Sequence, residues 1–189
     1  MCVNTQRRRG TDLEDALYAA TLAELAEVGY GKLSMEGIAT RAHTGKAALY
    51  RRWTNKHDLV IAALRDALPE LPMPDNGRTV RENLRAVLTT LCDVLARPNP
   101  FPYINIVGEL VREPEFRAMF TQDIVAPRLR VIQSVLRHGV ETGEIAPDTI
   151  TPLTAKTGPA LVMQTVLLTG KPPNRAEIET IIDTMLHSR

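Results

Sequence analysis

Residues 38–59 of this 189-residue chain read IATRAHTGKAALYRRWTNKHDL. They have the dimensions of a helix-turn-helix, in which two short helices are joined by a turn of three or four residues. The first short helix is expected over residues 34–42 and the second over 46–53. Small or apolar side chains would let the two helices cross closely: Ile38, Ala39, Ala42 and Leu49. This pattern predicts a helix-turn-helix.

Positive charge is concentrated around this stretch. Residues 30–57 contain six lysine and arginine side chains against Glu36 alone, a net charge of +5, while the whole chain carries only +1. The remainder therefore carries −4, and a basic module on a mildly acidic body is typical of a protein that binds duplex DNA. The alternative is a helical adaptor that binds another protein, and salt-sensitive DNA binding would distinguish the two.

The remainder of the chain has apolar residues at helical spacing and no convincing run of alternating β-branched residues. We therefore expect an all-α protein with a three-helix N-terminal domain over residues 1–56 and a helical C-terminal domain over residues 57–189. A fourth helix near residues 56–68 would join the two domains. Further helices are expected near residues 80–95, 103–112, 123–142, 152–169 and after Asn174.

The opening stretch resembles the DNA-binding signature of the TetR family of transcriptional regulators. In that family an Ile-Ala pair opens the motif, a Leu-Tyr pair lies in the recognition helix, and an aromatic residue closes it before a Lys-x-x-Leu sequence. The matching residues here are Ile38-Ala39, Leu49-Tyr50, Trp53, Lys56 and Leu59. Two positions depart from the pattern, because His43 and Thr44 stand where the family usually has glycine and valine.

This resemblance implies a fold and a function. It implies a helix-turn-helix DNA-binding domain at the N-terminus and a ligand-binding and dimerisation domain at the C-terminus. By analogy with the family, the chain would be a repressor that a small-molecule effector releases from DNA. The fourth helix would carry the change from one domain to the other.

The resemblance also places the 46–53 helix in the major groove, where side chains near its N-terminus reach base edges. Lys46 would donate to guanine acceptors, and the methyl groups of Ala47 and Ala48 would contact thymine methyl groups. The expected DNA-contacting residues are Thr40, Arg41, Thr44, Lys46, Ala47, Ala48, Tyr50, Arg51, Arg52 and Lys56. Alternatives stay open: the two arginines form a solvated face, or Tyr50 is a core tyrosine with an exposed hydroxyl. Trp53 is expected to pack against the first helix.

Arg7, Arg8 and Arg9 form a basic N-terminal arm. Basic arms can lie along the minor groove or the DNA backbone. A solubilising tail is an equally good interpretation, and the sequence leaves both open.

The C-terminal half is expected to dimerise and to bind an effector. A DNA-binding domain this small needs two copies to recognise a specific site, so we expect a homodimer on a near-palindromic operator. Residues 123–142 and 152–169 are apolar over more than one face and would form a four-helix bundle across the two-fold axis; alternatively, both are central core helices. A pocket for an unknown effector would lie inside these helices. Its candidate residues, each more often plain core than ligand contact, are Phe101, Tyr103, Asn105, Phe116, Met119, Phe120, Met163 and Gln164.

No catalytic motif is present. Thr40 stands where a phosphate-binding loop needs glycine, and the chain has no G-x-S-x-G, H-E-x-x-H or G-x-G-x-x-G sequence. Its four histidines and two cysteines lack metal-ligand spacing, and Cys92 falls at an apolar helix position. We therefore expect no enzyme activity, no metal and no cofactor. The sequence has no signal peptide and no apolar run of about 18 residues, so a cytoplasmic location without a membrane is expected.

Overall fold

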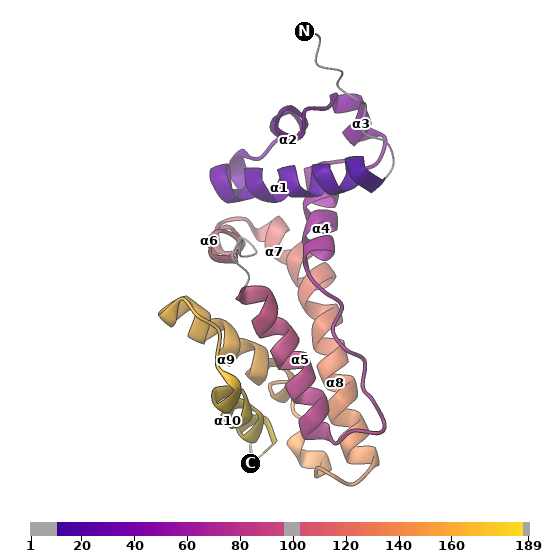
Figure 1. The fold of residues 1–189 in the computed structure, drawn as a ribbon, viewed down its shortest axis with the longest axis vertical. Helices are drawn as coiled ribbons and strands as arrows, with labels where there is room; N and C mark the ends of the chain where they lie inside the picture. The colour runs from indigo at the N-terminus through magenta and orange to yellow at the C-terminus, as the bar shows by residue number, and fades with distance from the viewer. Residues whose placement is uncertain (1–10, 97–102, 187–189) are drawn as a thin grey trace. The chain divides into compact units, whose positions relative to one another are not determined.

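The computed structural model describes residues 11–96 and 103–186, which fold into helices joined by short connections (Figure 1). No strand occurs in this described part of the chain, and the all-α prediction is confirmed. The helices group into two compact units, and each unit is built from two separate stretches of the chain.

Unit 1 combines Met1–Ala67 with Pro102–Phe120. Its helices are α1 (Thr11–Lys32), α2 (Met35–Arg41), α3 (Lys46–Tyr50), α4 (Lys56–Ala67), α6 (Tyr103–Arg112) and α7 (Pro114–Phe120). Helices α6 and α7 therefore pack with the N-terminal helices, although all of α5 lies between them in the sequence. The boundary between functional domains after residue 56 stays a prediction, because the two units are defined by packing alone.

The core of unit 1 is formed by branched aliphatic side chains from all four N-terminal helices. The largest completely buried ones are Leu17, Leu25, Ile38, Leu49, Leu59 and Leu64. Trp53 is also buried, and its ring lies edge-on to that of Tyr18 on α1, with the ring centroids 5.7 Å apart. The prediction that Trp53 packs against the first helix is confirmed.

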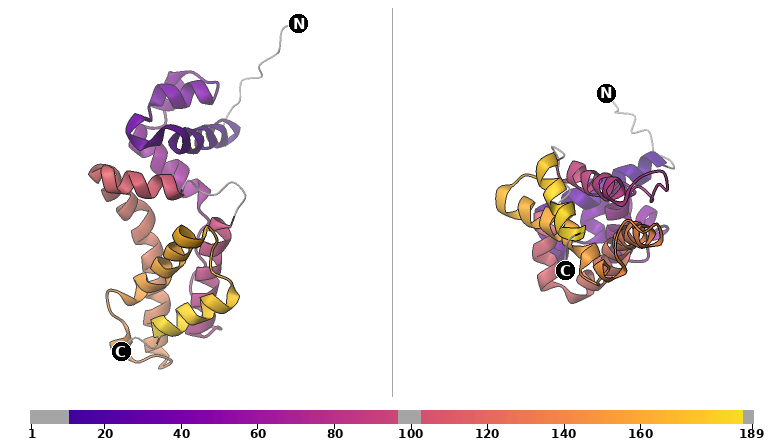
Figure 2. Two further views of the ribbon diagram at one scale, coloured as in Figure 1. Left: turned by 90° about the vertical axis from the view of Figure 1, so that its left-hand side faces the viewer. Right: turned by 90° about the horizontal axis from the view of Figure 1, so that it is seen from below.

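Unit 2 combines Leu68–Phe101 with Thr121–Arg189. Its elements are α5 (Val80–Leu95), a π-helical turn η1 (Thr121–Val125), α8 (Ala126–Glu141), a short 3-10 turn η2 (Pro147–Thr149), α9 (Thr154–Thr169) and α10 (Arg175–Leu186). Helices α9 and α10 lie side by side in both views of Figure 2. A shared core holds α5, α8, α9 and α10 together, and its completely buried members are Leu84, Leu88, Leu136, Val162, Ile182 and Met185.

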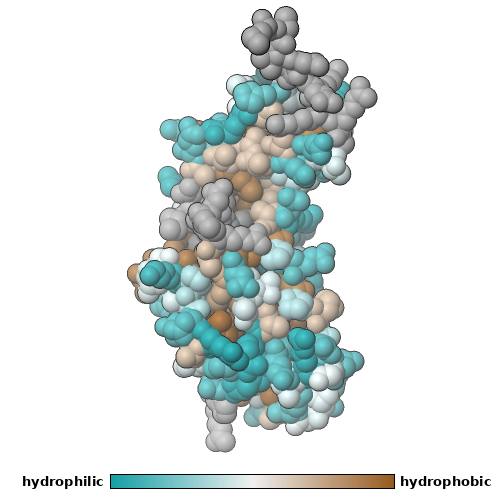
Figure 3. Space-filling view, in the orientation of Figure 1, coloured by the Kyte–Doolittle hydropathy of each residue, from teal (hydrophilic) through white to brown (hydrophobic). Residues whose placement is uncertain are grey.

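The surface of unit 2 differs between its last two helices. On the face drawn in Figure 3, hydrophilic residues cover the region of α10, whose outward side chains include Glu177, Thr180 and Asp183. Hydrophobic residues reach the surface near the C-terminal end of α9, where Leu167 and Leu168 are exposed. Among the described residues, no helix has the length and apolar character needed to cross a membrane.

Gly139→Ala is expected to destabilise unit 2. A Cβ at position 139 of α8 would overlap Cγ2 of Val80 and lie 3.2 Å from Cγ1 of Ile145. Alanine is otherwise favoured over glycine inside a helix by about 1 kcal/mol. The sign of the change in the free energy of unfolding therefore shows whether helix propensity or the overlap with Val80 dominates. Urea denaturation should give a free energy of unfolding lower by about 1–3 kcal/mol, the usual cost of overpacking.

The matched control is the same substitution in a Val80→Ala background. Removing the valine methyl groups makes room for the new Cβ, so the loss caused by Gly139→Ala should shrink there. Equal losses in both backgrounds would contradict this packing.

Candidate nucleic-acid interface

Helices α2 and α3 form the helix-turn-helix. Ser34 caps α2, because its Oγ accepts a hydrogen bond from Gly37 N at 3.0 Å. The turn between the helices is closed by Thr44 N, which donates to Ala39 O at 3.0 Å. The motif therefore lies where the sequence predicted it.

The second helix of the motif is shorter than predicted. Helix α3 ends at Tyr50, whereas the sequence predicted a helix continuing to Trp53. Arg52 N and Trp53 N both donate to Leu49 O, at 2.8 and 2.9 Å. These two bonds close a turn that directs the indole of Trp53 into the core. Burial of this large side chain takes precedence over continuation of the helix.

One of the two residues that depart from the TetR pattern, His43, has an unusual backbone conformation in the turn of the motif. His43 has φ +52°, and it is the one non-glycine residue with positive φ in the described part of the chain. This left-handed conformation is strained for most side chains, although histidine adopts it more often than most. The glycine that the TetR pattern usually has here would adopt it without that cost.

The predicted DNA-contacting residues differ in exposure. Tyr50 is 52% exposed, so its ring does not belong to the core. The other exposed members of the set are Thr40, Arg41, Lys46, Ala47, Arg51 and Arg52. Ala48 is only 8% exposed and has little surface to offer a base, while Thr44 is half-buried. All ten DNA contacts stay predictions. The exposure of Tyr50 and of the six residues named after it makes them the better candidates.

Two of these cations already have carboxylate partners. Arg41 Nε donates to Glu24 at 2.6 Å and the guanidinium also pairs with Glu27; the hydrogen bonds that Arg41 donates to these carboxylates raise its pKa. Lys46 Nζ lies 2.7 Å from Glu36, and its hydrogen bond lowers the pKa of that carboxyl group. A DNA phosphate would have to exchange with these carboxylates, at modest cost because exposed ion pairs contribute little. The sequence analysis does not identify Glu24 and Glu27 as partners of Arg41. The available signal is that both carboxylates lie on the first helix.

Lys56 has a structural role in addition to its predicted one. Its Nζ donates to the carbonyl oxygens of Tyr30 at 3.0 Å and Leu33 at 3.2 Å, and it lies 4.6 Å from the centroid of the Tyr30 ring. The ammonium group therefore neutralises carbonyls at the end of α1. A contact between Lys56 and a phosphate stays a prediction.

The predicted effector-pocket residues fall in both units. Phe116, Met119 and Phe120 belong to α7 in unit 1, where Phe116 is fully buried and stacks on the Tyr30 ring with centroids 4.2 Å apart. Met163 and Gln164 lie on α9 in unit 2. Phe101 is outside the described residues, and so are the side chains of Tyr103 and Asn105. Neither unit contains all of the predicted pocket residues, so the effector pocket stays a prediction.

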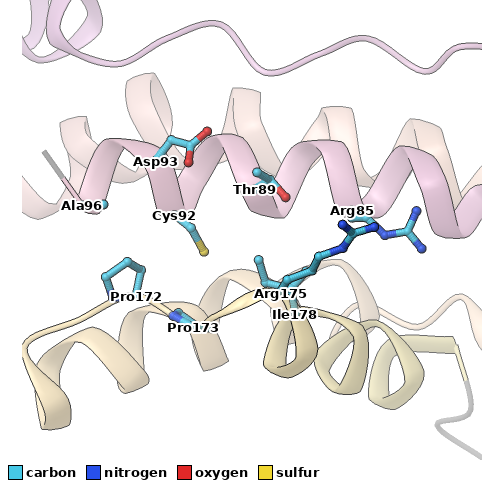
Figure 4. A pocket seen from close by; sticks show the side chains of 9 residues that line it. All are labelled: Arg85, Thr89, Cys92, Asp93, Ala96, Pro172, Pro173, Arg175 and Ile178. Atoms are coloured by element: carbon cyan, nitrogen blue, oxygen red, sulfur yellow. The ribbon is translucent and has the colours of Figure 1, made fainter.

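A groove of about 410 Å³ lies elsewhere in unit 2, between one face of α5 and the start of α10 (Figure 4). It is lined by Arg85, Thr89, Cys92, Asp93, Ala96, Pro172, Pro173, Arg175 and Ile178, none of which the sequence assigned to a pocket. Burial raises the pKa of the Cys92 thiol to about 11, so the thiol is protonated near neutral pH. This supports the interpretation of Cys92 as a structural thiol.

Two family models match the chain. The model for bacterial regulatory proteins of the tetR family matches residues 17–63, and the model for the tetracyclin repressor-like C-terminal domain matches residues 73–185. The chain belongs to the TetR family. It is thus a member of a family of DNA-binding transcriptional regulators.

Individual relatives of this TetR-family protein agree with that assignment. The chain is similar to a DNA-binding transcriptional repressor TetR of Mycobacteroides abscessus, with 28% identity over 94% of each chain. An uncharacterised HTH-type transcriptional regulator of Mycobacterium bovis is 26% identical over 92% of this chain and 85% of the relative. Among solved structures, the fatty acid degradation regulator FadR of Bacillus halodurans aligns with a TM-score of 0.72 and 19% identity, covering 96% of this chain and 97% of the other. That last likeness shows the fold.

In this TetR-family protein, His43→Gly is expected to stabilise unit 1. Glycine adopts the left-handed conformation freely, and the relief should outweigh the entropy that glycine adds to the unfolded chain. The free energy of unfolding should rise by up to about 1 kcal/mol in urea denaturation. His43→Ala removes the imidazole but keeps the Cβ, so it should give no gain. A gain of the same size from both variants would show that the imidazole, and not the backbone, is responsible.

Proposed function

We propose that this chain is a repressor that binds a near-palindromic DNA operator as a homodimer and that a small-molecule effector releases it. The observation that carries the DNA-binding part is the surface of the helix-turn-helix, where Tyr50, Arg51 and Arg52 are exposed at the end of α3. A regulator of this kind acts in the cytoplasm, and we propose no enzyme activity.

The chemistry of this surface fits duplex DNA. Arginine guanidinium groups bind phosphates or guanine edges, and a tyrosine hydroxyl donates to phosphate oxygens. Lys46 and Ala47 are exposed at the N-terminal end of α3, where side chains of a recognition helix reach base edges. The proposed phosphate contacts add Thr40 and Arg41 from α2 and Lys56 from α4.

Dimerisation is supported by the exposed apolar side chains of α9. Leu168 is 77% exposed and Leu167 is 46% exposed, and Leu153 at the start of the helix is also exposed. The outward side chains of α8 are polar, among them Arg137 and Gln133. The apolar part of the proposed seam therefore comes from 152–169, while α8, within 123–142, supplies its polar part.

The effector is proposed on the basis of the family, whose members are typically ligand-responsive repressors. Release then requires that the effector bind more tightly to the form of the dimer that does not fit the operator. The chemical class of the effector is left open.

DNA binding is tested by fluorescence anisotropy with a duplex selected from a random library, at several salt concentrations and against a scrambled duplex. The wild type should prefer the selected duplex and lose affinity steeply with salt. Tyr50→Ala should weaken operator binding by about tenfold, and Arg51→Ala should reduce the salt slope by about 1. Arg78→Ala, which removes the same charge from the exposed segment before α5, should leave the salt slope unchanged. A chain that binds no duplex even at low salt would favour the protein-adaptor alternative.

Dimerisation is tested by sedimentation of a Leu167→Glu, Leu168→Glu double variant. Burying two carboxylates in an apolar interface without partners is costly, so the variant should sediment as a monomer at concentrations where the wild type is a dimer. Gln133→Glu adds charge to the outward face of α8 as a comparison. Dissociation by Gln133→Glu alone would place the seam on α8, and a dimer unaffected by any of these changes would exclude both surfaces.

A further inference from the structure

Glu109 is a charged residue in an unusual place. It lies on α6, is only 9% exposed, and its Oε2 accepts a hydrogen bond from Gly31 N at 3.1 Å. Arg112, one turn further along the same helix, is 3.8 Å from its Oε1. Glutamate is rarely buried to this degree without partners, and here the partners are the backbone at the end of α1 and, at a longer distance, Arg112.

The approach of Glu109 depends on Gly29. Gly29 has φ +76° and ψ 165°, a conformation that is essentially restricted to glycine. A Cβ at position 29 would lie 3.1 Å from Glu109 Oε1. The glycine therefore bends the chain and also leaves room for the carboxylate.

Residues 29–33, which form the end of α1 and lead toward α2, are held from two sides. Glu109 accepts from the Gly31 N–H group, and Lys56 on α4 donates to the carbonyl oxygens of Tyr30 and Leu33. An anionic acceptor thus meets the amide and a cationic donor meets the carbonyls. Such charge-assisted hydrogen bonds are stronger than neutral ones, so the path of these few residues is closely fixed.

This segment leads directly into the recognition motif. Leu33 is buried, and the next residue, Ser34, is the cap on which α2 begins. Helix α2 has seven residues and is followed by the closed turn that leads to α3. Any displacement at Gly31 therefore moves the start of α2 and, with it, the recognition helix.

We propose that Glu109 is a positioning residue for DNA recognition: its carboxylate fixes residues 29–33 at the end of α1 and so sets the orientation of α2 and α3. The proposal rests on the proposed DNA binding. It makes α6 part of the recognition apparatus, although α6 contributes no residue to the expected DNA surface.

The direction in which DNA affinity changes when a negative charge is removed distinguishes a positioning role from simple electrostatics. Removing a negative charge from a DNA-binding protein lowers repulsion with phosphate and should strengthen binding slightly. Removing the side-chain acceptor of Gly31 N takes away a charge-assisted hydrogen bond and frees the segment. A positioning role therefore predicts weaker operator binding from the loss of a negative charge.

The experiment compares three variants that each remove one negative charge: Glu109→Ala, Glu109→Gln and Glu115→Ala. Glu115 is exposed on α7 and serves as the charge control. Glutamine keeps an oxygen that can accept from Gly31 N. Affinity for the selected operator and for the scrambled duplex is measured for the full chain, together with hydrogen exchange of the Gly31 amide and the circular dichroism spectrum.

We expect Glu109→Ala to bind the operator about tenfold more weakly, with unchanged or slightly higher affinity for the scrambled duplex and faster Gly31 exchange. Glu109→Gln and Glu115→Ala should bind the operator as well as the wild type or slightly better. The proposal is overturned if Glu109→Ala behaves like Glu115→Ala, or if Glu109→Gln loses as much affinity as Glu109→Ala.

Two further outcomes are informative. If Glu109→Ala does not fold, the Gly31 amide of Glu109→Gln decides: slow exchange with wild-type operator affinity supports the proposal, and fast exchange with that affinity overturns it. If the wild type binds no DNA, the proposed function fails by itself. Gly31 exchange in the three variants then still reports whether Glu109 fixes the segment.

Discussion

Helix α3, the second helix of the helix-turn-helix, has only five residues, and a helix of this length is not stable in water by itself. Its position is therefore a property of its surroundings. Leu49 anchors it from within, Ala48 lies against the core, and the closed turn after Ala39 fixes its beginning. Everything that this protein can read on DNA depends on how firmly the rest of unit 1 holds those few residues.

The elements that hold them come from distant parts of the sequence. Helix α1 supplies the long surface on which α2 lies, and α4 supplies Lys56 and the buried Leu59. Helices α6 and α7 add Glu109 and Phe116, the latter stacked on Tyr30. Tyr30 also shares a hydrogen bond with His57, so one aromatic side chain connects three helices. The unit is small, but its order depends on contacts that are far apart along the chain.

Much of this fold could be predicted from the sequence, because helical periodicity and capping residues are local signals. The helix-turn-helix, its Ser34 cap and the burial of Trp53 followed from spacing and residue type. Periodicity identifies which face of a helix is apolar but not which neighbour covers it. For this reason the sequence leaves Phe116, Met119 and Phe120 open as core or effector-pocket residues, and the structure places Phe116 in the core of unit 1.

The candidate DNA surface was predictable only in part, for an electrostatic reason. Counting charge along residues 30–57 treats every cation as free, whereas Arg41 is paired with Glu24 and Glu27 from outside that window. The length of α3 was also overestimated, because nothing local shows that Trp53 must turn inward. Both differences arise from tertiary contacts, which a count along the sequence does not contain.

The division of unit 1 into two stretches of chain has a consequence for how the protein is made. Translation delivers Met1–Ala67 first, then α5 of unit 2, and only afterwards Pro102–Phe120. Until that last stretch has left the ribosome, Tyr30 lacks its stacking partner and the amide of Gly31 lacks its acceptor. The helix-turn-helix unit is therefore completed only after residues 1–120 have been synthesised, and not when its N-terminal helices first emerge.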